Sequence, residues 1–382
     1  MKKILFTIWG GAKGERSPFD PWFTAGGEIA AKLKSIALLK YNWEVHFFTI
    51  SKRPCFETYE GIQLHQDLAI DAGNNSEIKP GEYYQERLTV LINDIKPDII
   101  YSRGVMPTSM NVVPVAKQHN IPVVVAVDDQ NFLDYFIDPC KNDWAKKIRY
   151  TFLNATGITV QHQGMIELLE KQLNISKYMR VISPGIDLNK FNNPPQYFDH
   201  LKKSGHITII FLSRLEGSKR QDLFIDALPG IIQDVNNIHV ILAGDGKNRL
   251  LLEKQVKNLG ISSYVTFPGK IDNDQVPALL SISDLSIFLS NREGFPTVLL
   301  EYLASGNPIV ASDIEPCKHI LLNEINGIFV KNDVDDISRK MIDLLKHTKK
   351  IENMKYHNLM RSKSFDILHT AKELNNYLGE LI

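Results

Sequence analysis

Short apolar runs and longer amphipathic segments alternate along the first half of the chain. The apolar runs predict strands at residues 3–8, 44–50, 61–65, 98–101, 122–127, 157–161 and 179–182. Segments between them place apolar residues at helical spacing, as at 28–40, 83–95 and 165–171. Because strands alternate with helices, this half predicts a parallel sheet covered by helices.

The pattern lapses over residues 183–205, where Pro, Gly, Asn and charged residues replace the apolar runs. A second alternation follows, with strands predicted at 207–212, 238–242, 264–267, 285–289, 308–311 and 327–330. Helices are expected between them at 221–232, 250–259, 276–281 and 296–305. The sequence therefore predicts an α/β protein with two doubly wound domains, residues 1–185 and 206–364, joined by a linker at 186–205.

Composition narrows the class of protein. A chain of 382 residues exceeds one ordinary core, which fits two domains. Its 44 basic and 44 acidic residues balance, so the chain lacks the excess of positive charge that would indicate a nucleic-acid partner. Three scattered cysteines and the lack of a long apolar run point to a cytoplasmic protein, and the short apolar N-terminus is interpreted as the first strand.

The stretch Glu293-Gly-Phe-Pro-Thr-Val-Leu-Leu-Glu301 combines two carboxylates with a helix start, since Pro296 suits a first helical turn. It follows a predicted strand, and open α/β sheets bind ligands at the carboxyl ends of their strands. We expect a phosphate to be held by free backbone amides at the helix start, namely those of Thr297, Val298 and Leu299. Glu301 would accept hydrogen bonds from a ribose diol, and Glu293 would face the other end of a nucleotide sugar. The alternative is an ordinary helix with a surface acid at each end.

Two cations follow the first strand of the second domain. Arg214 and Lys219 leave that strand and precede a helix. A guanidinium can clamp a diphosphate in a bidentate manner, and an ammonium adds a point charge. The alternative is a solvated basic turn. The next strand is followed by Gly244-Asp-Gly246, where either a binding loop or a plain tight turn requires glycine.

In the first domain, Gly26-Gly27 stands between a strand and a helix start, where backbone can approach a ligand closely. The chain has neither the dinucleotide fingerprint nor the phosphate loop of nucleoside triphosphatases.

These motifs together resemble a known family. The run 214–219, the turn 243–246, the stretch 293–301 and the run 305–313 are similar to the retaining nucleotide-sugar glycosyltransferases of family 4. The resemblance implies the GT-B architecture, in which two Rossmann-like domains face each other across a cleft. It also implies that a last helix, within residues 365–382, crosses back to the N-terminal domain.

By this resemblance, Arg214 and Lys219 would hold the donor diphosphate, and Glu293 would contact the transferred sugar. Backbone contacts to the donor would come from Gly294, Phe295, Pro296, Thr297, Val298 and Leu299, with Glu301 on the ribose. Lys270 and Ile271 would meet the base, while Gly26, Gly27 and Gly244 would lie close to the ligand. The donor would be UDP- or GDP-linked, with no metal and no other cofactor.

The sequence departs from the family's pattern at several places. Asp128-Asp129 replaces a histidine, His319 replaces a glutamate, and the loop at 10–25 is long. Because the strands at 98–101 and 122–127 should be neighbours, Arg103 and Asp128 would emerge at the same sheet edge. We expect them to pair and to leave a carboxylate oxygen for a sugar hydroxyl. The alternative is that Asp128 only caps its loop.

Weaker candidates remain. The triplets Asp272-Asn-Asp274 and Asp333-Val-Asp335 match a short metal-binding signature that arises often by chance. His162 would line the site or pack in the interior. The segment 141–153 carries Trp144 with Lys146, Lys147 and Arg149, which predicts either a wet basic helix face or contact with a lipid-linked acceptor or an anionic bilayer.

The function expected from these features is transfer of a hexose from a nucleotide donor to an acceptor hydroxyl, with retention of configuration. The family's habits favour bacterial-type surface glycan synthesis, with a glycan, lipid-linked or small-molecule acceptor. Two alternatives stay open. One is a nucleotide-sugar 2-epimerase on the same fold, and the other is a non-catalytic subunit that binds nucleotide sugars.

Overall fold

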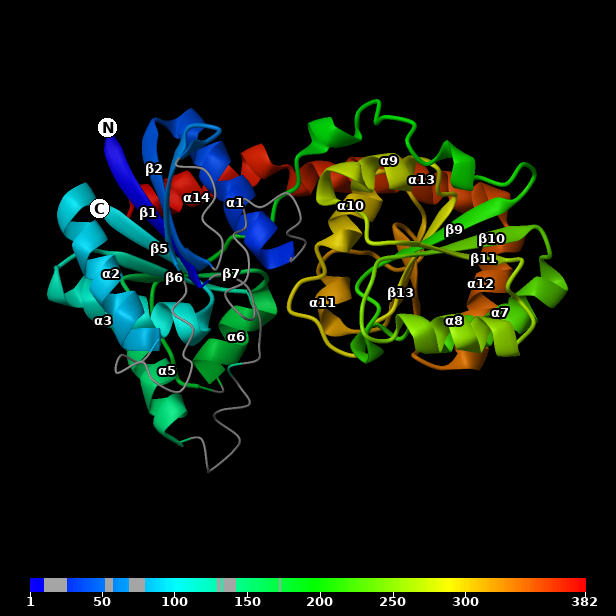
Figure 1. Cartoon of the computed structure of the whole chain (residues 1–382), viewed down its shortest axis with the longest axis horizontal. Coiled ribbons are helices and arrows are strands. Elements are labelled where there is room, and N and C mark those ends of the chain that lie inside the picture. The colour runs from blue at the N-terminus through cyan, green and yellow to red at the C-terminus, as the bar shows by residue number, and fades with distance from the viewer. Residues whose placement is uncertain (10–25, 52–57, 69–79, 129–131, 133–141, 172) are drawn as a thin grey trace. The chain divides into compact units, whose positions relative to one another are not determined.

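The computed structural model describes residues 1–9, 26–51, 58–68, 80–128, 132, 142–171 and 173–382. The chain forms two compact units (Figure 1). Unit 1 comprises Met1–Gly185 and Ile367–Ile382, and unit 2 comprises Ile186–Asp366.

Unit 1 is built on an eight-stranded sheet in the order β3-β4-β2-β1-β5-β6-β7-β8. Every pair is parallel except β3 with β4. The strands are β1 (Lys2–Trp9), β2 (Trp43–Ser51), β3 (Thr58–Tyr59), β4 (Ile62–Leu68), β5 (Ile99–Arg103), β6 (Val123–Val127), β7 (Gly157–Val160) and β8 (Met179–Val181). All the predicted strands of this half are present, and the short β3 was not predicted.

Helices cover both faces of this sheet because successive side chains of a buried strand point to opposite sides. Leu5 of β1 belongs to the core beneath α2 (Pro80–Ile95), α3 (Met110–Gln118) and α5 (Asn142–Asn154). Its neighbours Ile4 and Phe6 pack on the other face, where the core includes residues of α1 (Gly26–Leu38) and α14 (Ile367–Gly379). Unit 1 also contains helix α6 (Gln163–Lys171) and the π-helical turn η2 (Val105–Ser109).

The last helix belongs to unit 1, as the resemblance implied. The hydroxyl of Tyr377 donates to the carbonyl oxygens of Ile158 (3.2 Å) and Tyr178 (2.7 Å). The indole of Trp43 donates to Asn375 (2.8 Å). These bonds and the apolar contacts of Leu374 and Leu378 seat α14 beside α1.

Unit 2 contains a six-stranded parallel sheet in the order β11-β10-β9-β12-β13-β14. The strands are β9 (Ile207–Leu212), β10 (Ile238–Ala243), β11 (Val265–Gly269), β12 (Leu285–Phe288), β13 (Ile309–Ser312) and β14 (Gly327–Val330). The helices are α7 (Gln221–Asp234), α8 (Arg249–Asn258), α9 (Val276–Ser281), α10 (Val298–Ala304), α11 (Glu315–Lys318), α12 (Val334–Lys346) and α13 (Thr348–Ser362). The predicted strands lie within about two residues of those observed, so the fold class of two doubly wound α/β units is confirmed.

The segment at 186–205, which we expected to link the domains, lies within unit 2. The amide of Ile186 donates to Phe365 (2.8 Å), and Leu188, Phe191, Phe198 and Leu201 pack against the core formed by α9 and α10. The apolar residues spaced through this Pro- and Asn-rich stretch explain why it packs. Among the described residues, no helix combines the length and the apolar character that crossing a bilayer requires.

Candidate functional site

The predicted site residues of unit 2 lie at one edge of its sheet. All six strands are parallel, so the loops that follow them emerge together at the carboxyl edge. Arg214 and Lys219 follow β9, Gly244 follows β10, and the stretch at 293–301 follows β12. Lys270, which is exposed, and Ile271, which is buried in the core, follow β11.

Lys219 and Glu293 form an ion pair across this edge. Both side chains are only 15% exposed, and the ammonium lies 5.5 Å from the centre of the Phe288 ring. The sequence predicts that Lys219 binds the diphosphate and that Glu293 faces the sugar at the other end of the ligand. The structure instead brings them together, so that a diphosphate must compete with Glu293 for the ammonium. Burial raises the pKa of the nearby Cys317 thiol, and the charge of Glu293 adds to this effect.

Arg214 differs from Lys219 in its exposure. Its side chain is 68% exposed, and its guanidinium pairs with Glu216 at 3.1 Å. The backbone beneath it is fixed, because Gln221 donates to the carbonyl oxygen of Arg214 at 2.8 Å. The guanidinium is therefore an exposed cation on an anchored loop, which suits a clamp on an arriving ligand.

A polar network that we did not predict supports the loops of the ion pair. The hydroxyl of Ser312 accepts from the amide of Ser290 (3.0 Å) and donates to the Asn332 side chain (2.5 Å). Asn332 in turn donates to the carbonyl oxygen of Ser290 (3.0 Å) and to Asn291 (3.2 Å). The amide of Asn291 donates to Ser218 (2.9 Å), next to Lys219. A polar residue at or just after each of β12, β13 and β14 was the signal that could have identified this network.

Tyr302, also not predicted, joins two strand ends beneath the site. Its hydroxyl accepts from the amide of Leu212 (3.0 Å) and donates to the carbonyl oxygen of Ile287 (3.1 Å). Burial raises the pKa of this phenol, so it stays a neutral donor. The bridge fixes the exit of β9 toward Arg214.

Gly244 is required by close packing against the loop that carries Arg214. Its φ is +137°, and a Cβ there would lie 1.9 Å from the carbonyl oxygen of Ser213. The Gly244 amide donates to Gly269 (2.8 Å). At Gly246, a Cβ would lie 2.5 Å from the carbonyl oxygen of Leu215. The structural reason for glycine in this turn is therefore packing between two loops of the site.

The start of α10 differs from the expectation in one respect. The helix begins at Val298, and the amide of Leu299 donates to the carbonyl oxygen of Pro296 (3.0 Å). The prediction that this amide is free for a phosphate was wrong, because the chain forms a turn just ahead of the helix. Phe295, Pro296 and Leu299 are buried, whereas Gly294, Thr297 and Val298 are half-buried.

Glu301 lies one turn into α10 and is half-buried. Burial disfavours the carboxylate and raises its pKa to about 7, while the charge of Lys190 opposes the shift. Lys190 comes from the 186–205 segment and also pairs with Asp274 at 2.5 Å. A carboxyl group poised near neutral pH is well suited to bind hydroxyl groups, since their hydrogen bonds favour the charged form.

In unit 1, Arg103 and Asp128 form the ion pair that we predicted. The distance between Arg103 Nε and Asp128 Oδ2 is 2.5 Å, and the side chains are 17% and 13% exposed. Arg103 ends β5, and the parallel pairing of β5 with β6 places Arg103 opposite Ala126. Gln161 donates to the other carboxylate oxygen of Asp128 at 3.4 Å. The predicted pairing is confirmed, whereas the sugar contact stays a prediction.

Lys34 of α1 is a buried lysine that sequence reasoning missed. It is 4% exposed, and its ammonium donates to the carbonyl oxygen of Ile182 at 3.3 Å. Burial lowers its pKa to about 8, the charge of Asp128 raises it, and that of Arg103 lowers it. A lysine on the buried stripe of an amphipathic helix was the available signal. It brings a second cation to the Arg103–Asp128 pair.

The remaining candidates of unit 1 are less informative. Gly26 and Gly27 form the first turn of α1, which begins at Gly26 rather than after the glycine pair. His162 is 5% exposed, which matches the alternative of a packed histidine. The loop at 10–25 and Asp129 lie outside the described residues.

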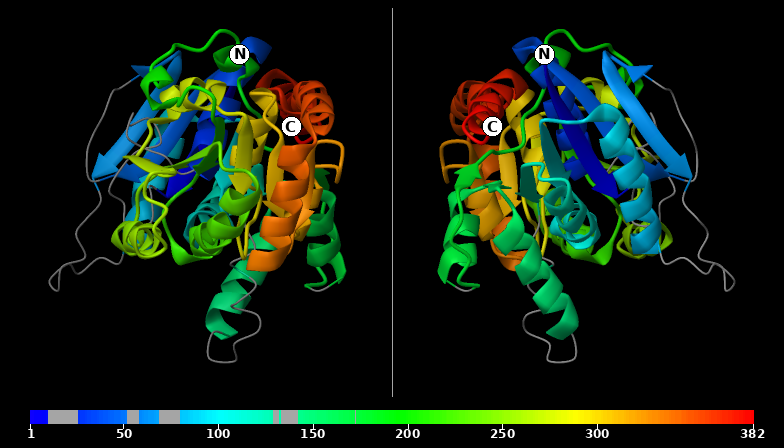
Figure 2. Two further views of the ribbon diagram at one scale, coloured as in Figure 1. Left: turned by 90° about the vertical axis from the view of Figure 1, so that its right-hand side faces the viewer. Right: turned by 90° about the vertical axis from the view of Figure 1, so that its left-hand side faces the viewer.

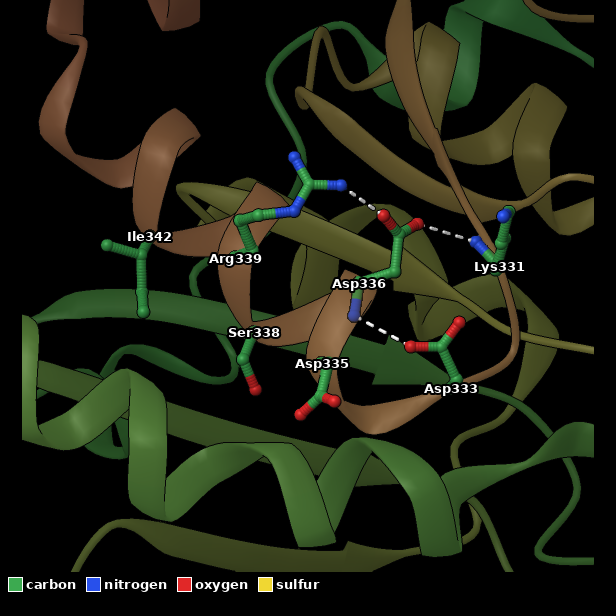
Figure 3. A pocket seen from close by; sticks show the side chains of 7 residues that line it. All are labelled: Lys331, Asp333, Asp335, Asp336, Ser338, Arg339 and Ile342. Carbon is green, nitrogen blue, oxygen red and sulfur yellow. Dashed lines mark hydrogen bonds and ion pairs between the residues drawn. The ribbon is translucent and has the colours of Figure 1, made fainter.

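One residue of the second acidic triplet, Asp333, caps a helix. The residues drawn in Figure 3 line a hollow at the start of α12, which has a volume of about 650 Å³. There Asp333 accepts from the amide of Asp336 (2.8 Å), and Asp336 accepts from the amide of Lys331 (2.8 Å) and from Arg339. This is a helix cap. In the part of the chain that is described, no group of three or more His, Cys, Asp or Glu side chains could hold a metal ion. Metal independence stays a prediction.

Two Rossmann-like units, with the last helix returned to the first unit, define the GT-B class. The structure superposes on sucrose-phosphate synthase from Thermosynechococcus elongatus with a TM-score of 0.83 at 16% identity, covering 100% of this chain and 99% of that one. An Anabaena HepE structure in complex with UDP and glucose gives a TM-score of 0.78 at 17% identity, covering 100% of both chains.

Residues 193–359 match the family model "Glycosyl transferases group 1". A GDP-mannose-dependent alpha-(1-6)-phosphatidylinositol monomannoside mannosyltransferase of Mycobacterium tuberculosis is 27% identical over 179 residues, which are 44% of this chain and 46% of the relative. The chain spans about half the length, or less, of the first curated relatives it matches. The family match of unit 2 and the structures that share the fold support a GT-B glycosyltransferase, and the predicted resemblance is confirmed at this level.

Proposed function

We propose that this chain is a retaining hexosyltransferase of family 4, which moves a sugar from a nucleoside diphosphate to an acceptor hydroxyl. The observation that carries the proposal is the half-buried Lys219–Glu293 ion pair at the carboxyl edge of unit 2. A cation and an acid in contact there can separate when a ligand arrives. The ammonium then meets the diphosphate and the carboxylate meets the sugar hydroxyls.

In this proposal Lys219 and Arg214 stabilise the negative charge that develops on the diphosphate as its bond to the anomeric carbon breaks. Glu293 orients the sugar, and Glu301 accepts hydrogen bonds from the ribose. The end of β11 and the start of α10 supply backbone contacts to the base and the phosphates. The acceptor oxygen forms the new bond on the face from which the diphosphate leaves, and its proton passes to the departing diphosphate oxygen.

The donor is proposed to be UDP- or GDP-linked. UDP is named in the HepE structure, and GDP-mannose in the name of the mycobacterial relative. That relative's name describes a lipid acceptor, which supports a glycan or lipid-linked acceptor for this chain, and a small molecule remains open. We place the activity in the cytoplasm and in surface glycan synthesis.

The test is a thermal-shift panel of UDP- and GDP-sugars, followed by turnover with the sugar that stabilises most. A donor at about 100 times its dissociation constant should add about 2.7 kcal/mol to the free energy of unfolding. The anomeric configuration of the product, read by NMR, tests retention. Conversion of the donor to another sugar without acceptor would point to the epimerase instead, and a panel without any stabilising nucleotide sugar would overturn the proposal.

Turnover is proposed to need no metal, because Arg214 and Lys219 supply the charge that a divalent ion provides in other transferases. The expected result is an unchanged rate in excess chelator. Loss of activity that added magnesium or manganese restores would contradict this part of the proposal.

A further inference from the structure

A hollow on unit 1 lies apart from the ion pairs described above. It has a volume of about 970 Å³ and is lined by α2, by η2 with α3, and by α5. Pro107, Met110, Trp144 and Tyr150 form its apolar wall, and Lys146 and Lys147 contribute its cations. Each of the three helices follows the carboxyl end of a strand, so the hollow lies toward the edge that carries Arg103 and Asp128.

Large apolar side chains of α5 remain in contact with solvent. Trp144 and Tyr150 are each 43% exposed, and Leu153 is 45% exposed. The core stripe of the same helix consists of Ile148, Thr151 and Phe152, which are fully buried. The exposed residues are therefore not needed to seat α5 on the sheet, and they present amphipathic rings to the outside. Figure 2 shows that the first turns of α5 (blue-green) project from unit 1.

Lysines accompany these rings. Lys147 lies 5.6 Å from the centre of the Trp144 ring, and Lys117 of α3 lies 5.7 Å from the centre of the Tyr150 ring. Lys146 pairs with Asp143 at 3.4 Å, but the two side chains are 78% and 90% exposed, so this pair holds the lysine weakly. These three lysines outnumber the acidic residues that the structure describes at the hollow and on the first turn of α5, which are Glu82 and Asp143.

Aromatic rings with a polar edge, a hollow with an apolar wall and a local excess of lysines suit the boundary between lipid headgroups and acyl chains. The rings occupy the headgroup level, the long lysine side chains reach the phosphates, and an anionic surface attracts the excess positive charge. A neutral protein overall, with 44 basic and 44 acidic residues, attracts such a surface only through a local patch.

We propose that the face formed by α2, α3 and α5 docks on an anionic phospholipid bilayer, with Trp144 and Tyr150 at headgroup level and Lys117, Lys146 and Lys147 against the lipid phosphates. Membrane docking is a property separate from glycosyl transfer, and its test needs no turnover. Failure of the docking test would therefore not affect the proposed transferase activity, and failure of the transferase test would not affect the proposed docking. It places the Arg103–Asp128 edge of unit 1 toward lipid-borne acceptors.

The experiment measures sedimentation of the full chain with sucrose-loaded vesicles, made of phosphatidylcholine alone or mixed equally with phosphatidylglycerol. We expect binding to the mixed vesicles and little to the neutral ones. Raising the salt concentration from about 0.1 M to about 1 M should release the protein, because the screening length falls from about 10 Å to about 3 Å. Equal binding to both vesicles, or binding to neither, would overturn the proposal.

Two variants and a control localise the binding. Lys146→Gln with Lys147→Gln should weaken partitioning about 25-fold, at about fivefold for each lysine near the surface. Trp144→Ala with Tyr150→Ala should also weaken it at the lower salt concentration. Lys254→Gln with Lys257→Gln removes two exposed lysines from α8 of unit 2 and should leave it unchanged. Loss in this control, or none in the first two variants, would contradict the proposed face.

Tryptophan emission gives an independent readout. Mixed vesicles should shift the emission of the unmodified chain to shorter wavelength as Trp144 enters the headgroup region. Trp144→Phe should abolish this shift while the protein still sediments with the vesicles, since phenylalanine keeps an apolar ring. Far-UV circular dichroism confirms that each variant is folded. A shift that persists in Trp144→Phe would place the lipid contact elsewhere.

Discussion

Lys219 and Glu293 form an ion pair although 74 positions separate them along the chain. Each is only 15% exposed, so neither charge is well solvated without the other. The pair holds the ammonium of Lys219 in place before a donor binds. Arg214, on the same loop, is 68% exposed and pairs with Glu216. The two cations assigned to one diphosphate therefore differ in what they do for the fold.

Lys219→Ala and Arg214→Ala should both strongly reduce turnover, but they should differ in their effect on the free energy of unfolding. Removal of one charged donor from the departing diphosphate commonly costs about 2.7 to 4 kcal/mol of barrier, or about 10² to 10³ in kcat. Lys219→Ala also leaves Glu293 unpaired and should lower the free energy of unfolding by about 1–3 kcal/mol. Arg214→Ala should change the free energy of unfolding by no more than about 1 kcal/mol, because an exposed ion pair contributes little to stability.

Steady-state rates at saturating donor and urea unfolding followed by far-UV circular dichroism separate these effects. Lys247→Ala is the matched control, since Lys247 is an exposed lysine near the same sheet edge. Near-normal rates for both variants would remove Arg214 and Lys219 from the proposed chemistry.

Asp128→Ala should destabilise unit 1 more than Arg103→Ala does. The Asp128 variant leaves two buried cations, Arg103 and Lys34, whereas the Arg103 variant leaves Asp128 with Lys34 nearby. Breaking a buried pair commonly costs about 3–5 kcal/mol. Both variants should impair sugar transfer far more than nucleotide binding. Equal stability losses in the two variants would contradict the role given to Lys34.

All four tryptophans lie at positions 9, 22, 43 and 144, so their fluorescence reports the unfolding of unit 1. The control is the double variant Arg103→Met with Asp128→Leu, which replaces the pair by apolar side chains and should recover most of the stability. Sugar transfer should stay impaired in it.

Binding of the nucleotide sugar should strengthen as the pH rises through about 7. Burial raises the pKa of Glu301 to about 7, and the carboxylate is the form that accepts hydrogen bonds from a ribose diol. In the limit, affinity should fall about tenfold for each pH unit below that value. Glu301→Gln should flatten the profile, which calorimetry at several pH values would show.

The stability of the ligand-free protein should change with pH in the opposite direction. A folded-state carboxyl pKa above the unfolded value means that the fold loses stability as the pH rises from about 4.3 to about 7. Glu301→Gln should therefore raise the melting temperature of the ligand-free protein at pH 8. Weaker donor binding together with greater stability would be hard to explain by general damage to the fold.

Gly244→Ala should disrupt both the fold and donor binding. The added Cβ would lie 1.9 Å from the carbonyl oxygen of Ser213, at a φ of +137° that side chains rarely adopt. The loop of Arg214 must then move, at a cost of about 2 kcal/mol or more. Gly217→Ala is the control, because a Cβ there would come no closer than 3.7 Å to the side-chain nitrogen of Asn248. Urea unfolding and donor titration of both variants decide the point, and equal tolerance would contradict the packing argument.

The sequence by itself determined most of the strands of the two sheets. Buried parallel strands are continuous apolar runs, so β9, β10 and β14 were visible within one residue of their observed bounds. The same logic placed Arg103 and Asp128 at one edge, because neighbouring parallel strands end together. The glycines after β10 were interpreted as a binding loop or a tight turn, and the structure shows that Gly244 packs against the carbonyl oxygen of Ser213.

Only the tertiary structure decided which polar groups meet. Local spacing shows that Lys219 and Glu293 each follow a strand, but not that their loops converge into one ion pair. Nor could it show that Ser290, Ser312 and Asn332 bond to one another, because such pairing depends on the order of the strands across the sheet. The ionisation of Lys34 and Glu301 is likewise set by burial against distant segments. Desolvation is a property of the folded surroundings, and the sequence of a single helix does not contain it.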